Sequence, residues 1–109
     1  MKQNGTIKYY GYSFPAYNTP IEARKEDKHK KAVLVKYEDA VKLVKFGLRG
    51  MEDYTQHYDE KRRDNYLSRS AEIKDKTGRP TKDDPFSANY WSRRILWLSK
   101  EPILKSEIK

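Results

Sequence analysis

The chain contains no cysteine and two well-separated histidines, His29 and His57. Without cysteine there is no disulfide framework and no thiolate metal site, and two distant histidines do not predict a structural zinc site. Apolar runs extend over a few residues at most, and the N-terminus lacks the hydrophobic segment of a signal peptide. Neither a membrane span nor secretion is indicated, so we expect packing or protein partners, and no metal or cofactor, to hold the fold together.

The composition is low in apolar residues and high in charged ones. Of the 109 residues, 36% are hydrophobic and 37% are charged, and the net charge is +8. This length suits one small domain with a modest core. The positive charge favours association with a polyanion: DNA, RNA, an anionic membrane surface or an acidic protein.

The segment DPFSANYWSRRILWL (84–98) predicts a helix that Asp84 or Ser87 caps. At helical spacing, one stripe that should face the core contains Ala88, Trp91, Ile95 and Leu98. On the same wheel Arg93 lies nearly opposite Trp91, so we expect it to meet solvent, an acidic partner or a phosphate. Arg94 lies on the flank, where we expect its guanidinium to stack on an aromatic ring.

The N-terminal segment is rich in aromatic residues interrupted by glycine and proline, which predicts an extended arm with a short strand near residues 6–10. Exposed tyrosine rings would be unfavourable in water, so the arm should lie against protein. It either packs on its own domain or docks into a neighbouring subunit, and the predicted contact residues are Tyr9, Tyr10, Tyr12, Phe14 and Tyr17. The following charged stretch, IEARKEDKHKK (21–31), indicates a solvated linker whose basic end, 28–31, is a weaker candidate for a phosphate contact.

Residues 32–48 fit either a helical stripe or a hairpin, and the hairpin is favoured because β-branched residues alternate on both sides of Glu38 and Asp39. Gly47 and Gly50 should then end the sheet. From Asp59, a capping residue, the pattern becomes helical. This second helix and Arg93 supply the candidate nucleic-acid-binding residues, which are Lys61, Arg62, Arg63, Tyr66, Arg69 and Arg93. Acidic neighbours on the helix leave a self-neutralised surface as the alternative.

Together these patterns predict an α+β fold: a single small domain with a β-hairpin followed by two helices and an extended aromatic N-terminal arm. The expected boundaries are 1–31 for the arm and charged linker, 32–104 for the domain and 105–109 for a tail. Ile103 and Leu104 are expected to hold the C-terminal end against the domain.

From about Lys42 to Leu98 the order of motifs resembles a group of small lysine-rich proteins of large double-stranded DNA viruses and tailed phages. The resemblance rests on Phe-Gly at 46–47, Asp-Tyr-Thr-Gln-His at 53–57, the Arg-Arg pair at 62–63 and Tyr-Trp-Ser-Arg at 90–93. Ser70 stands where many members have histidine. The resemblance implies a viral or phage origin, and it implies no reaction.

Asp53, Thr55, His57 and Asp59 form the best candidate for a catalytic constellation, with His57 as a base. Alternating polar residues beside glycines more often tie down a loop, with the histidine hydrogen-bonded to backbone. No phosphate-binding glycine loop, nucleophile elbow or metal-ligand cluster accompanies them. We therefore expect a protein that is not an enzyme.

Two functions remain open. In the first, which we favour, the protein is a small basic structural component of a virion that docks on a larger capsid or head-tail subunit, where it can face the packaged genome. It is then expected in the virion, and in the host cytoplasm during assembly. In the second, it is a nucleic-acid-binding accessory protein of viral transcription, replication or genome packaging. The aromatic arm favours the first function and the net charge of +8 favours the second.

Overall fold

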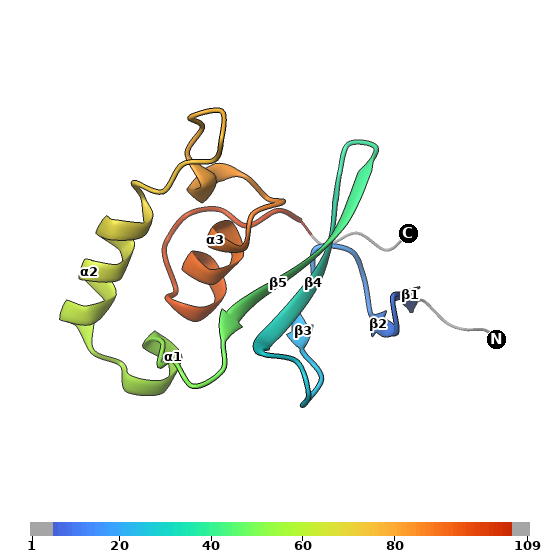
Figure 1. The fold of residues 1–109 in the computed structure, drawn as a ribbon, viewed down its shortest axis with the longest axis horizontal. Helices are drawn as coiled ribbons and strands as arrows, with labels where there is room; N and C mark the ends of the chain where they lie inside the picture. The colour runs from blue at the N-terminus through green and yellow to red at the C-terminus, as the bar shows by residue number, and fades with distance from the viewer. Residues whose placement is uncertain (1–5, 106–109) are drawn as a thin grey trace.

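A long antiparallel hairpin of β4 (His29–Tyr37) and β5 (Ala40–Leu48) runs through the middle of the molecule (Figure 1). The structure, a computed structural model, describes residues 6–105. Along the chain the other elements are β1 (Ile7–Tyr9), β2 (Tyr12–Phe14), β3 (Ile21–Glu22), α1 (Tyr54–His57), α2 (Glu60–Ser70), the 3-10 turn η1 (Thr81–Asp83), α3 (Ala88–Trp91) and the π-helical turn η2 (Ser92–Leu96). The predicted α+β class is confirmed.

The hairpin forms because β-branched residues alternate on both of its strands. Val33 lies opposite Val44, and Tyr37 lies opposite Ala40, so Glu38 and Asp39 make the turn. Glu38 adopts the left-handed conformation that such a tight connection requires (φ 57°). The predicted hairpin is therefore confirmed. Gly47 does not end the sheet as expected, since β5 continues to Leu48.

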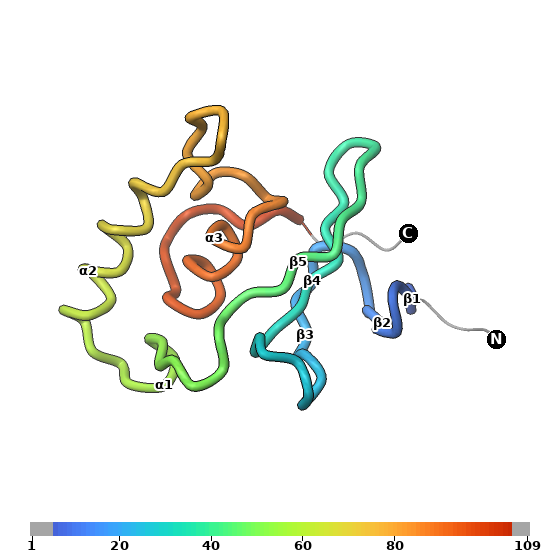
Figure 2. The backbone as a smooth tube through the Cα atoms, viewed as in Figure 1, coloured from blue at the N-terminus to red at the C-terminus, as the bar shows by residue number. Residues whose placement is uncertain are grey.

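Both faces of the hairpin are buried, which makes the fold three layers deep (Figure 2). On one face the helical segments cover a cluster that contains Val33, Val35, Val44, Phe46, Tyr90, Trp91, Leu96 and Trp97. On the other face the β1–β2 hairpin covers Ala32 and Leu34. Two-sided burial explains why the four consecutive residues 32–35 are all fully buried, a pattern usual for interior strands.

The aromatic arm packs on its own domain. The predicted short strand is present as β1, and it pairs with β2 in a small hairpin. Tyr12 and Phe14 are 4% and 0% exposed. Their prediction as contacts to another protein is therefore wrong, because they already fill the core beneath the sheet. Tyr9 and Tyr17 are partly buried in the same cluster, whereas Tyr10 is 76% exposed.

The expected linker at 21–31 belongs to the sheet. Ile21 pairs with Ala32 across β3 and β4, and β4 already begins at His29. The boundary expected after residue 31 thus falls inside a strand. The first five residues of the arm, and residues 106–109 of the expected tail, lie outside the described residues.

Two acidic residues begin the helices that follow the sheet. The Asp53 carboxylate accepts a hydrogen bond from the Thr55 backbone and caps the short helix α1. Asp59 accepts from the backbone of Lys61 and Arg62 and caps α2, as the sequence predicts. Within residues 6–105, no helix is long and apolar enough to cross a membrane.

The C-terminal helix differs from its prediction after the first turn. Ser87 caps α3, Trp91 is fully buried and Ile95 is partly buried against the core, as expected. Leu98 is 43% exposed and left-handed (φ 49°), so its assignment to the core is wrong. The π-helical turn η2 shifts the helical spacing, and the chain leaves the helix before Leu98 returns to the buried side.

Candidate nucleic-acid interface

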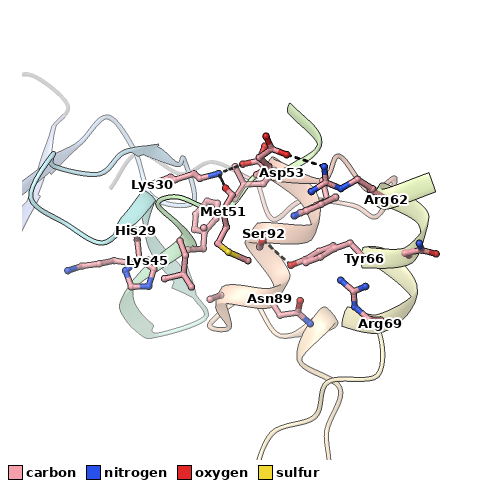
Figure 3. A pocket seen from close by; sticks show the side chains of 18 residues that line it. His29, Lys30, Lys45, Met51, Asp53, Arg62, Tyr66, Arg69, Asn89 and Ser92 are labelled. Atoms are coloured by element: carbon pink, nitrogen blue, oxygen red, sulfur yellow. Dashed lines mark hydrogen bonds and ion pairs between the residues drawn. The ribbon is translucent and has the colours of Figure 1, made fainter. Parts of the chain in front are cut away.

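A cleft of about 520 Å³ lies between α2, the end of the β4–β5 hairpin and the first turns of α3 and η2 (Figure 3). His29, Lys30 and Lys45 come from the strands, Arg62, Tyr66 and Arg69 from α2, and Asn89 and Ser92 from the C-terminal helix. Three segments distant in sequence therefore build one concave surface, with basic groups on two of its sides.

The inner surface of the cleft is apolar and aromatic. The Tyr66 ring stacks on Trp97 with centroids 4.2 Å apart and planes 8° from parallel. The Tyr66 hydroxyl lies 3.1 Å from Ser92 Oγ, which fixes the ring at its outer end. At Gly47 a Cβ would lie 2.5 Å from Leu96 Cδ1, so any other residue would have to displace Leu96 and would also adopt an unfavourable left-handed backbone conformation (φ +76°).

Lys30 ties the strand side of the cleft to α1. Its ammonium donates to Asp53 Oδ2 at 2.6 Å and to Gln56 Oε1 at 2.7 Å. Burial alone would raise the pKa of Asp53, but the hydrogen bonds from Lys30 and Thr55 outweigh burial and hold the pKa below its ordinary value. This ion pair stabilises the rim of the cleft, and the Asp53 carboxylate balances most of the positive charge of Lys30.

Asp27 holds a second group of cations near the cleft. Its carboxylate accepts from Lys45 at 2.8 Å and from the Tyr12 hydroxyl at 2.9 Å, and His29 Nδ1 lies 3.2 Å away. The hydrogen bond from Lys45 is the main reason that the pKa of Asp27 lies far below its ordinary value. The same bond raises the pKa of Lys45.

The helix side of the cleft carries two arginines in different states. Arg62 donates to Glu52 at 3.0 Å, and both side chains are about half exposed. The Arg69 side chain is exposed and makes no hydrogen bond or ion pair with any residue in 6–105. Arg69 therefore presents a fully charged guanidinium to whatever enters the cleft.

Of the six residues predicted to bind nucleic acid, three line the cleft and three do not. Arg62, Tyr66 and Arg69 all line the cleft, as their shared helical face predicts. Lys61 is exposed on α2 but does not line the cleft. Arg63 points to the other side, where it donates to the backbone carbonyls of Trp97 and Leu98.

The prediction that Arg93 faces solvent is wrong, because Arg93 is 5% exposed. Its guanidinium pairs with both carboxylate oxygens of Glu101 at 3.1 and 2.8 Å and donates to Leu67 O and Ser70 Oγ at 2.6 Å. The C-terminal segment folds back over this side of the helix (Figure 2). Arg93 thus makes four hydrogen bonds inside the protein, and its burial keeps it from reaching a phosphate.

Arg94 behaves as predicted. Its guanidinium lies 3.7 Å from the centroid of the Tyr90 ring and donates to the carbonyls of Pro102 and Lys82. Burial lowers the pKa of Arg94, although the nearby Tyr90 and Glu101 partly offset this effect. Together with Arg93, it fastens the C-terminal segment to the helix, where Leu104 packs on the core and Ile103 stays exposed.

The candidate catalytic constellation consists of helix caps. Asp53 caps α1 and binds Lys30, Thr55 donates to Asp53, and the backbone of Asp59 donates to His57 Nδ1 at 2.9 Å. The prediction that His57 is hydrogen-bonded to backbone is confirmed. Its other ring nitrogen, Nε2, is buried without a hydrogen-bond partner in the described part of the chain.

Sequence reasoning missed three side chains that shape the cleft: Lys30, Lys45 and Asn89. In the sequence, Lys30 appears only within the charged run 28–31, which is a weaker candidate for a phosphate contact. Lys45 has one visible signal, its position between Val44 and Phe46 on an alternating strand. Their proximity to α2 depends on the turn between β5 and α1, which no local pattern predicts.

Comparison with known protein families finds a match in the central region of the chain. Residues 22–70, which extend from β3 through α2, match the model of a family of unknown function, DUF5754. No curated protein matches the chain. No solved structure matches it either. The matched region includes Arg62, Tyr66 and Arg69 but ends before the C-terminal helix that closes the cleft.

Proposed function

We propose that the protein is a nucleic-acid-binding accessory protein that contacts its ligand through the cleft beside α2. The observation that carries this proposal is the exposed Arg69 guanidinium, which has no partner among residues 6–105 and lies in a concave site with an aromatic ring. Cations with interleaved aromatic rings suit a ligand with charged phosphates and flat bases. The net charge of +8 adds long-range attraction to the same ligand.

The pairing of Arg62 does not prevent it from taking part. Its partner Glu52 is 59% exposed, and exposed ion pairs contribute roughly 0–1 kcal/mol. A phosphate can therefore displace Glu52 at little cost. Lys30 differs, because its partner Asp53 is 4% exposed and would be left as a buried charge.

The structure gives less support to the alternative function, in which the aromatic arm docks on a larger virion subunit. Of the five aromatic residues predicted to make that contact, Tyr12 and Phe14 are core residues, and Tyr10 alone remains strongly exposed. A location inside a virus particle rests on the resemblance noted above. The basic cleft is compatible with that location because a packaged genome presents the same phosphates.

The test is the salt dependence of binding for matched charge variants. Arg62→Gln/Arg69→Gln removes two cations from the cleft, and Lys74→Gln/Lys76→Gln removes two from an exposed loop outside it. For the cleft variant we expect the slope of log K against log salt to fall by about 0.7–0.9 for each lost contact. The loop variant should retain the wild-type slope. Equal slopes for both variants, or no binding to DNA or RNA at low salt, would refute the proposal.

A further inference from the structure

We propose that the cleft holds one unpaired base of a single-stranded nucleic acid, with the adjoining phosphate on Arg69. This inference rests on the proposed function and specifies its ligand. It follows from the volume of the cleft, the charge on the outer face of α2, the aromatic stack and the orientation of one amide. Each of these features distinguishes a single strand from a duplex.

The shape and charge of this face are unsuited to a duplex. A cleft of about 520 Å³ lies within the range of small-molecule pockets and matches a single nucleotide. A helix that enters a major groove needs cations along its outer face. The exposed residues of α2 outside the cleft instead mix Glu60 and Asp64 with Lys61, so this face lacks the row of cations that would follow a duplex backbone.

Tyr66 provides a stacking surface of fixed orientation. Trp97 occupies one face of the Tyr66 ring, so a base that stacks on Tyr66 must use the opposite face. The ring is already held by Trp97 and by the Ser92 hydroxyl, and binding therefore costs little side-chain entropy. A paired base inside a duplex has both faces covered and is unable to use this surface.

Asn89 adds a hydrogen-bond acceptor of known orientation. Its side-chain nitrogen donates to Ser70 O at 2.8 Å and to Thr81 Oγ1 at 3.0 Å, and these two bonds determine which end of the amide is oxygen. Among residues 6–105 no donor meets the Asn89 oxygen. Every unpaired base presents an N–H donor on its Watson–Crick edge, and pairing in a duplex occupies that donor.

Arg69 comes from α2 and lies at the same end of the cleft as Asn89, whose amide donates to Ser70, the residue after Arg69 (Figure 3). A base inserted into the cleft brings its own phosphate to the rim, where the Arg69 guanidinium makes no hydrogen bond or ion pair with any residue in 6–105. In this arrangement the Asn89 oxygen is available to the edge of the base, and the exposed Arg69 side chain is available to the phosphate. This arrangement suits a strand that crosses the cleft and inserts one nucleotide.

The first experiment measures fluorescence anisotropy with a short labelled DNA strand, the same sequence as RNA, and the DNA annealed to its complement. We expect tighter binding to either single strand than to the duplex. Arg69→Gln should weaken single-strand binding about fivefold at 0.1 M salt, as expected for one lost phosphate contact. Lys61→Gln removes an equally exposed cation from the same helix outside the cleft and should have little effect.

The second experiment uses Trp97 as a probe. Trp97 lines the cleft, whereas Trp91 is fully buried and does not. A base that stacks on Tyr66 should change the emission of Trp97 through the shared stack, and Trp97→Phe should abolish that signal. Tyr66→Leu removes the ring and should bind roughly five- to a hundredfold more weakly than wild type. Tyr66→Phe keeps the ring but loses the Ser92 hydrogen bond, so its affinity should fall between those of wild type and Tyr66→Leu.

Thermal unfolding of each variant shows whether a loss of binding is due to unfolding of the protein. If Tyr66→Leu is unfolded, Arg69→Gln and the Trp97 signal of the wild-type protein decide the question. Equal binding to single strand and duplex, with no change in Trp97 emission, would overturn the base-insertion model while leaving the proposed nucleic-acid function intact. Absence of binding to all three probes would overturn both.

Discussion

Replacing Arg93 should lower the free energy of unfolding much more than replacing an exposed arginine. In Arg93→Met the apolar stem remains, but Leu67 O and Ser70 Oγ lose their charged donor and Glu101 loses a two-point partner. A buried group left without its partner costs about 1–3 kcal/mol. Glu101 is 26% exposed, so water replaces part of its lost pair and its share is discounted. The expected loss is about 3–5 kcal/mol in total.

Urea denaturation followed by circular dichroism measures this loss directly. Arg69→Met is the matched control, because Arg69 is exposed and has no partner among residues 6–105, so the same substitution there should change stability by less than about 0.5 kcal/mol. Arg93→Lys keeps the charge without the planar fork and should fall between the two. An Arg93→Met protein as stable as the control would show that Arg93 faces solvent, as its helical-wheel position indicates, and that the Glu101 contact is absent.

Three further outcomes follow from the fold. Gly47→Ala should destabilise by roughly 1–3 kcal/mol in thermal unfolding, because the new Cβ meets Leu96 at a left-handed backbone position; an unchanged midpoint would mean that strand and helix are further apart. Deleting residues 1–20 should abolish cooperative unfolding by exposing Leu34, so a cooperative transition in the truncated chain would refute the role of the arm in the core. The pKa of Asp27 is lowered in the folded state, so its stabilisation is complete above the unfolded-state pKa of about 3.9 and is lost as the pH falls towards the folded value. An acid titration of stability should therefore decline less steeply in Asp27→Asn than in wild type, and parallel curves would exclude this contribution.

The hairpin and α2 are the elements that local sequence predicts best. Alternating β-branched residues around Glu38 and Asp39 have one favourable arrangement, and Asp59 caps the helix with its own side chain. The shared face of Arg62, Tyr66 and Arg69 also follows from helical spacing alone. These features involve residues that are close in sequence, so few alternatives compete.

The surroundings of each element determine what local patterns leave open. The wheel for residues 84–98 assumes one buried side, but the sheet, α2 and the C-terminal segment enclose this helix, and both Arg93 and Arg94 are buried. Their burial is possible because Glu101 and several backbone carbonyls satisfy the charges.

The same distinction explains the arm and the cleft. The aromatic residues of the arm indicate that it needs an apolar surface, and the exposed underside of the β4–β5 hairpin supplies one within the same chain. The cleft needs Lys30, Tyr66 and Asn89 to meet from three separate elements. The sequence by itself determined the hairpin around Glu38 and Asp39, the Asp59 cap and the basic character of α2. Only tertiary packing decided which charges are buried and which remain available to a ligand, because burial depends on partners far away along the chain.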